Sequence, residues 1–175
     1  MTAGSPRWNP VPGVQPSAGQ ISRQDGAAMV IGVGNPLRGD DGAGLVVASL
    51  VAQSAPDGVR VIAFEREPLD LIEEMAGAQS VWLIDAVSSG AAAGTLLRFD
   101  ASDEPLPAGL FGVSTHHFGL ADALELARRL GRLPARVIVH GIEGASFANG
   151  PELSTQVARA TGRLAALVAA EVAAC

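Results

Sequence analysis

Short apolar runs alternate with segments of helical periodicity from Met29 to the end of the chain. The strand-like runs are Met29 to Gly34, Val59 to Phe64, Ser80 to Asp85, Gly94 to Phe99 and Arg136 to His140. The first, third and fifth runs are nearly continuous in apolar residues, which is typical of strands covered on both faces. This pattern predicts about five strands of a buried, mostly parallel sheet.

The segments between these runs carry apolar stripes at helical spacing. The stripes consist of Ala43, Val46, Val47, Leu50 and Val51, then Leu120, Leu124, Ala127 and Leu130, and finally Leu153, Val157, Ala160, Leu164, Leu167 and Val168. A shorter helix is expected to begin near Pro68. Regular alternation of strands and helices predicts a single-domain, doubly wound α/β fold with helices on both faces of the sheet.

The length of 175 residues suits one domain, which we expect over residues 29–175. Residues 1–28 are rich in Pro, Ser, Gly and Gln and contain no long apolar segment, so they predict a flexible amino-terminal extension. The net charge of -6 argues against binding to nucleic acid or to an anionic membrane surface. No apolar run is long enough to cross a bilayer, and the single cysteine is the last residue. We therefore expect a cytoplasmic protein without disulfides. The sequence leaves its oligomeric state open, a monomer included.

Polar side chains collect where the predicted strands end. Asp40 and Asp41 follow the first strand, Asp85 ends the third, and His116 and His117 precede the second helical stripe. Ligands of open α/β sheets bind outside the carboxyl ends of the strands. Carboxylates and imidazole at such an edge suit a divalent transition metal.

Each of these residues also has a structural interpretation. Asp40 or Asp41 could cap the first helix, Asp85 could bond to a neighbouring loop, and His116 could be a polar residue at a helix start. His140 is expected to be a strand-end residue with a local partner. Glu143 either lines the cleft or is solvated.

A phosphate-binding loop is disfavoured by the same segment. The glycines of "GVGNPLRG" stand at 32, 34 and 39, which does not match GxGxxG, and the chain has no lysine for a GxxxxGK[ST] motif. Two acids at a helix start would also repel a pyrophosphate. We therefore expect no nucleotide, and the loop is predicted to hold something positive.

Four segments resemble the nickel-iron hydrogenase maturation proteases. They are "GVGNPLRGDDGAG", "LIDAV" with the following "GT", "STHHFGLADALELARRLG" and "GIEGASFANGPELSTQV", which occur in the family's order between residue 29 and about residue 160. The resemblance implies an endopeptidase that removes the carboxy-terminal extension of a hydrogenase large-subunit precursor after nickel insertion. It also implies that the nickel arrives on the precursor and is contacted by Asp41, Asp85 and His116.

Two departures from the family pattern stand out. Asp41 occupies a position that is usually Glu, which implies a closer approach to the metal or looser ligation. "FEREPLDL" replaces a Gly-rich segment after the second strand, so the substrate-facing loop differs from that of many members.

No Ser-His-Asp or Cys-His arrangement is evident, so a metal-assisted attack by water is expected, with Asp40 or a liberated carboxylate as base. A non-catalytic metal-checking or chaperone module for the same precursor and an α/β hydrolase acting on another protein remain alternatives.

Overall fold

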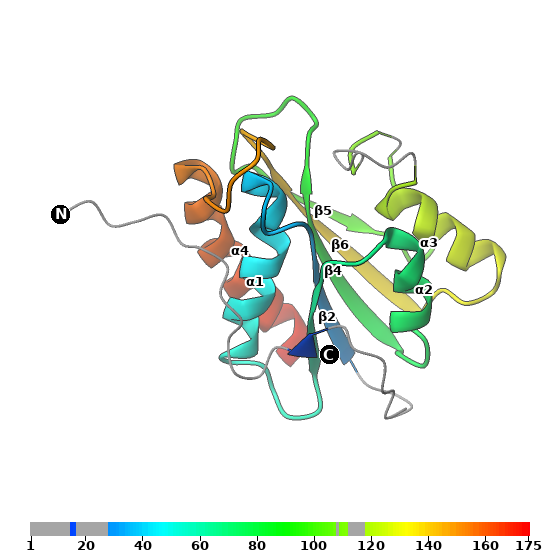
Figure 1. Ribbon diagram of the computed structural model, residues 1–175. Helices are drawn as coiled ribbons and strands as arrows, with labels where there is room; N and C mark the ends of the chain where they lie inside the picture. The colour runs from blue at the N-terminus through cyan, green and yellow to red at the C-terminus, as the bar shows by residue number, and fades with distance from the viewer. Residues whose placement is uncertain (1–14, 17–27, 108, 112–117) are drawn as a thin grey trace.

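A six-stranded sheet organises the chain in the computed structural model, which describes residues 15–16, 28–107, 109–111 and 118–175 (Figure 1). The strands are β1 (Gln15–Pro16), β2 (Ala28–Val33), β3 (Arg60–Phe64), β4 (Ser80–Val87), β5 (Leu96–Asp100) and β6 (Arg136–Glu143). They lie in the order β1-β3-β2-β4-β6-β5, and every neighbouring pair is parallel except β5 with β6. The predicted mostly parallel sheet of about five strands is confirmed, with the two-residue β1 added at one edge.

β1 falls within the expected amino-terminal extension. It pairs with Ile62 and Ala63 of β3, while residues 1–14 and 17–27 lie outside the described part of the chain. The division into a flexible extension over residues 1–28 and a domain over residues 29–175 stays a prediction.

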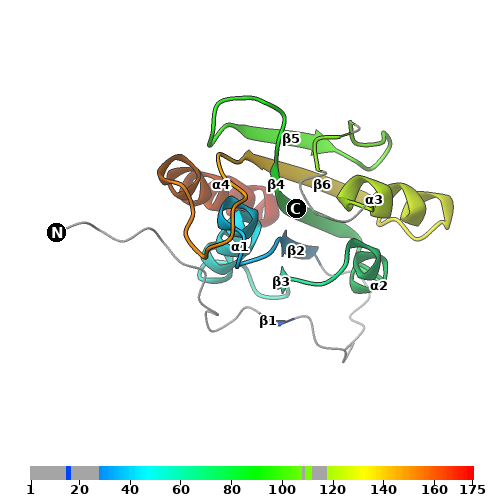
Figure 2. The same cartoon turned by 45° about the horizontal axis from the view of Figure 1, so that its top comes forward.

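The helices cover both faces of the sheet. A 3-10 turn, η1 (Gly39–Gly42), leads into α1 (Ala43–Ala52), and η2 (Pro68–Asp70) leads into α2 (Leu71–Glu74). The last two helices are α3 (Leu120–Arg129) and α4 (Thr155–Ala173). α1 and α4 lie on one face, and α2 and α3 lie on the other (Figures 1 and 2), which confirms the doubly wound arrangement. In the described residues, no helix is both long and apolar enough to cross a membrane.

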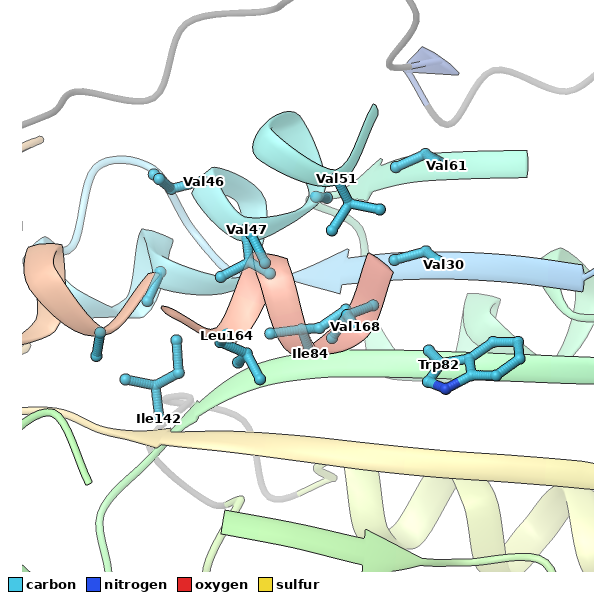
Figure 3. Close-up of a cluster of buried hydrophobic side chains, with 14 of the residues drawn as sticks. Val30, Val46, Val47, Val51, Val61, Trp82, Ile84, Ile142, Leu164 and Val168 are labelled. Carbon is cyan, nitrogen blue, oxygen red and sulfur yellow. The ribbon is translucent and has the colours of Figure 1, made fainter. Parts of the chain in front are cut away.

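The core consists of two clusters, one on each face of the sheet. Val30, Trp82 and Ile84 belong to the cluster under α1 and α4, where Val47 and Leu164 face them (Figure 3). Met29 and Ile31, the neighbours of Val30, belong to the other cluster. Alternate residues of β2 thus enter opposite clusters, because side chains alternate across a strand. This explains why the strand is apolar throughout.

Glycines let α1 lie very close to the sheet. A Cβ on Gly44 would overlap the carbonyl oxygens of Val33 and Ile84, and one on Gly32 would overlap the carbonyl of Gly44. This contact fixes the start of α1, and with it η1, at the carboxyl ends of β2 and β4.

The connections after β2 and β3 leave the sheet in opposite directions. The chain passes from β2 to α1 on one face, and from β3 to α2 on the other (Figure 2). Such divergence opens a crevice at the carboxyl ends of the strands. The fold therefore places a crevice between residues 34–42 and residues 65–70.

Candidate functional site

A pocket of about 180 Å³ lies at the carboxyl ends of β2, β3 and β4. It is lined by residues 33–35, 65–68 and 85–86, together with Arg38, Asp41, Phe111 and Leu120. Two of the predicted metal ligands, Asp41 and Asp85, thus share one pocket although they are far apart in the sequence. The edge of the sheet predicted from the strand ends is the edge that carries this pocket.

Asp41 reaches the pocket from η1. The residue is 9% exposed, and burial raises the pKa of its carboxyl above the ordinary value of 3.8. The Arg38 guanidinium, 3.6 Å from Oδ2, and a backbone hydrogen bond with Asn35 act in the opposite direction. Arg38 therefore supports the charged form of Asp41 at the pocket wall.

Asp85 lies near the carboxyl end of β4 and is also 9% exposed. Its pKa is raised well above 3.8, first by burial and then by the negative charge of Asp41. In the described part of the chain its carboxylate accepts one hydrogen bond, from the N–H of the next residue, Ala86, at 2.8 Å. Among the described residues, no contact supports the alternative that Asp85 forms a hydrogen bond to a neighbouring loop. Two buried carboxyls that repel each other form a site whose charge a cation would neutralise.

Asp40 is arranged quite differently from its neighbour. It is fully buried, and its Oδ2 accepts hydrogen bonds from the backbone N–H groups of Ala145 (2.7 Å) and Ser146 (2.9 Å). Its Oδ1 accepts one from the N–H of Ser154 (2.6 Å). Asp40 thus ties η1 to the loop before α4. Its action as a base stays a prediction.

Asp40 and Asp41 do not occupy the cap position of α1, which is held by Gly42. Both lie in the first turn of η1, which leads into that helix. The donors to Asp40 come instead from more than a hundred residues further along the chain.

Glu143 holds a second loop in the same way as Asp40. The residue is 2% exposed, and its carboxylate accepts hydrogen bonds from the N–H groups of Ser89 and Gly90 and from the Ser89 hydroxyl (2.7 Å). Neither alternative for Glu143 is confirmed, because it is buried and it does not line the pocket.

His140 was expected to end its strand beside a local partner, but it lies within β6, which continues to Glu143, and its partner comes from α4. Its Nε2 lies 3.3 Å from Oε2 of Glu171 on α4, and that carboxylate also accepts bonds from Trp82 Nε1 (2.9 Å) and Arg98 Nε (2.8 Å). Burial lowers the pKa of His140, against the opposing effect of Glu171. These contacts belong to the packing of α4 on the sheet and lie apart from the pocket.

The third predicted metal ligand, His116, and its neighbour His117 lie outside the described residues. Among the residues that are described, no three His, Cys, Asp or Glu side chains form a group able to hold a metal ion. The structure therefore brings together Asp41 and Asp85, and the membership of His116 stays a prediction.

Sequence reasoning gave no role to Arg38 or Phe111, both of which line the pocket. Arg38 immediately precedes the "GDD" segment, and a basic residue three positions before an acid on a helical turn is the signal that could have identified its pairing with Asp41.

Comparisons with known proteins point to the family that the sequence motifs resemble. Residues 45–171 match the sequence profile described as "Hydrogenase maturation protease". The hydrogenase 2 maturation protease of Escherichia coli is 33% identical over 119 residues, which cover 65% of this chain and 71% of that protein. The hydrogenase expression/formation protein HupM of Azotobacter chroococcum is 30% identical over 121 residues, covering 68% of this chain. The match spans only 58% of the length of HupM.

Among solved structures, the hydrogenase maturating endopeptidase HybD from E. coli is similar in fold, with a TM-score of 0.70 and 28% sequence identity. The similarity covers 83% of this chain and 91% of that one. The maturation protease HycI from Thermococcus kodakarensis has a TM-score of 0.67 at 23% identity, with 83% and 92% covered, and shows the likeness of fold alone.

Proposed function

Since the chain belongs to the hydrogenase maturation protease family, we propose that it is an endopeptidase that cleaves a nickel-iron hydrogenase large-subunit precursor. It removes the carboxy-terminal extension of that precursor once nickel has been inserted. The same proposal places the reaction in the cytoplasm, the compartment expected from the sequence.

The observation that carries the proposal is the pairing of Asp41 and Asp85 in one pocket. Burial raises the pKa of both carboxyls, and Asp41 raises that of Asp85 further. A divalent cation bound between them would offset both effects, because it favours the charged form of each carboxyl. Such a pocket suits recognition of the nickel that a loaded precursor carries and an unloaded precursor lacks.

His116 completes the proposed ligand set. Phe111 and Leu120 precede and follow it in the sequence, and both line the pocket. This supports a role for the intervening segment at the same site. Carboxylate oxygens and an imidazole nitrogen are suitable donors for a divalent nickel ion.

The chemistry then needs no nucleophilic side chain. Nickel held by the precursor and by the enzyme would polarise the scissile carbonyl or lower the pKa of an attacking water. The one cysteine, Cys175, lies with its Sγ 3.7 Å from Oγ of Ser80, at the start of β4. Asp85 is five residues further along that strand, about 17 Å away at strand spacing. Cys175 therefore lies too far from the pocket to attack a peptide bound there.

The test is cleavage of purified precursor, with and without nickel, followed by mass spectrometry of the carboxy terminus. We expect cleavage of the nickel-loaded precursor only. Asp41→Asn, Asp85→Asn and His116→Ala should each lower kcat/KM by about 100-fold or more, which corresponds to about 2.7 kcal/mol. Asp57→Asn, a change in an exposed loop residue, is the matched control and should retain full activity.

Two outcomes would contradict the proposal. A wild-type protein that binds loaded precursor and leaves its mass unchanged would be a metal-checking module. A fully active Asp85→Asn or His116→Ala enzyme would show that the assigned ligand set is wrong.

A further inference from the structure

Two strongly exposed leucines, on different connections of the sheet, are neighbours in sequence of residues that line the pocket. Leu37 is 68% exposed and Leu69 is 52% exposed. Leu37 lies between Asn35 and Arg38 of the pocket lining, and Leu69 directly follows Pro68 of the same lining. The described residues contain two other large apolar side chains of comparable exposure, Leu130 and Leu167.

The backbone holds Leu37 in its exposed position. Its N–H donates to Oδ1 of Asn35 (2.9 Å), and its carbonyl accepts from the N–H of Gly150 (2.9 Å). The next residue, Arg38, donates its N–H to the carbonyl of Asn35 (3.2 Å). The backbone of the turn is thus bonded on both sides of Leu37, which holds this residue at the surface.

Leu69 is presented by η2, a turn with no buried residue. Residues 34–42 and 65–70 belong to the two connections that leave the sheet toward opposite faces, so the two leucines belong to the two segments that border the pocket. Contact of an apolar side chain with water is unfavourable, and a partner that covers the side chain lowers the free energy.

Building on the proposed function, we propose that Leu37 and Leu69 bind the precursor by covering an apolar side chain next to the scissile bond. A peptide that brings nickel to Asp41 and Asp85 has to approach the two segments that carry these leucines, which makes the precursor the partner that the position favours. The leucines determine binding and specificity and take no part in the chemical step.

The test is steady-state cleavage of nickel-loaded precursor by Leu37→Ser and Leu69→Ser. We expect KM to rise about tenfold for each variant with kcat unchanged, since an exposed leucine that becomes covered contributes on the order of 1–2 kcal/mol. Leu167→Ser, which removes a leucine of 52% exposure on α4, is the matched control. Leu130→Ser is a second control at the far end of α3, about 15 Å from the pocket residue Leu120. Both controls should retain the wild-type KM.

The partner side chain is found by changing the precursor. Each apolar residue within three positions of the scissile bond is replaced by Ser in turn. For the precursor that lacks the partner side chain, the Leu37→Ser enzyme should have the same KM as the wild-type enzyme. An unchanged KM for Leu37→Ser and Leu69→Ser, with an active wild type, would overturn this inference and leave the proposed function intact. Concentration-dependent self-association that either variant abolishes would overturn it as well, because a second copy would then be the partner. An inactive wild type would contradict the proposed function itself.

Discussion

Asp40 and Asp41 are adjacent in the sequence but differ in how many hydrogen-bond donors their carboxylates have. Asp40 accepts three backbone N–H groups and lies away from the pocket lining, whereas Asp41 lines the pocket opposite Arg38. Glu143 resembles Asp40, and Asp85 resembles Asp41 in lacking such a set. Carboxylates that accept several N–H groups stabilise loops, and those with few donors are available to a cation.

This division could not be predicted from the sequence. The strand-end positions correctly identified Asp41 and Asp85 as neighbours at one edge. The donors to Asp40, however, come from Ala145, Ser146 and Ser154, over a hundred residues away, and no local pattern indicates them. A carboxylate at a helix start therefore looks the same in the sequence whether it serves a cap, a loop or a metal.

We expect Asp40→Asn to act through the loop before α4. An amide offers one acceptor oxygen in place of two, so a partly buried N–H of that loop loses its charged partner, at a cost of about 1–3 kcal/mol in the free energy of unfolding. Hydrogen exchange should accelerate at Ala145, Ser146 or Ser154. Glu143→Gln is the matched control, since it should accelerate exchange at Ser89 and Gly90 instead.

The cleavage assay distinguishes this role from that of a base. Loss of the tether should lower the rate at all pH values and keep the shape of the pH profile. Disappearance of the acidic limb of the profile in Asp40→Asn, with unchanged exchange at the three amides, would instead establish Asp40 as the base.

At the scale of elements, the apolar runs predicted the strands well because both faces of the sheet are covered. The ends of the strands were predicted less accurately. β6 was expected to end at His140 and continues to Glu143, and β4 continues beyond Asp85 to Val87. These polar residues remain in strands because distant partners satisfy them, Glu171 for His140 and the loop after β4 for Glu143. β1 has only two residues and no apolar run, so no periodicity could have revealed it.

The contact of α1 with the sheet gives a prediction for Gly44. A methyl group there would overlap two backbone carbonyl oxygens, which cannot move without distorting β2 and β4. Gly44→Ala should therefore lower the free energy of unfolding by about 3 kcal/mol, as overpacking does in rigid sites.

Gly162→Ala in α4 is the matched control. That position is exposed, and a methyl group added there would have nothing within 4 Å, so the better helix former should raise stability by about 0.5–1 kcal/mol. Urea denaturation measures both variants. If Gly44→Ala raised the free energy of unfolding as much as Gly162→Ala does, α1 would not lie against the strands as described.

For the whole molecule, the pocket and the packing of α4 make opposite contributions to the pH dependence of stability. The pKa of His140 is lowered from 6.5, chiefly by burial. When the pH is lowered, His140 therefore takes up a proton in the unfolded chain at a higher pH than in the folded protein. Stability is lost as the pH falls from 6.5 through the folded pKa. The pKa of Asp85 is raised well above 3.8, chiefly by burial and then by Asp41. Its contribution is fully present below pH 3.8 and is lost as the pH rises through the folded pKa.

Single variants separate these two contributions. Asp85→Asn, which keeps the shape and removes the charge, should be more stable than the wild type at pH 7, and this advantage should shrink as the pH is lowered toward 3.8. His140→Gln, which keeps an N–H group for Glu171, should lose less stability than the wild type when the pH falls below 6.5. Denaturant unfolding at a series of pH values measures both. If Asp85→Asn showed the same stability as the wild type at every pH, the Asp85 carboxyl would not be desolvated in the free protein, and a bound nickel ion would have no burial cost of that carboxylate to offset.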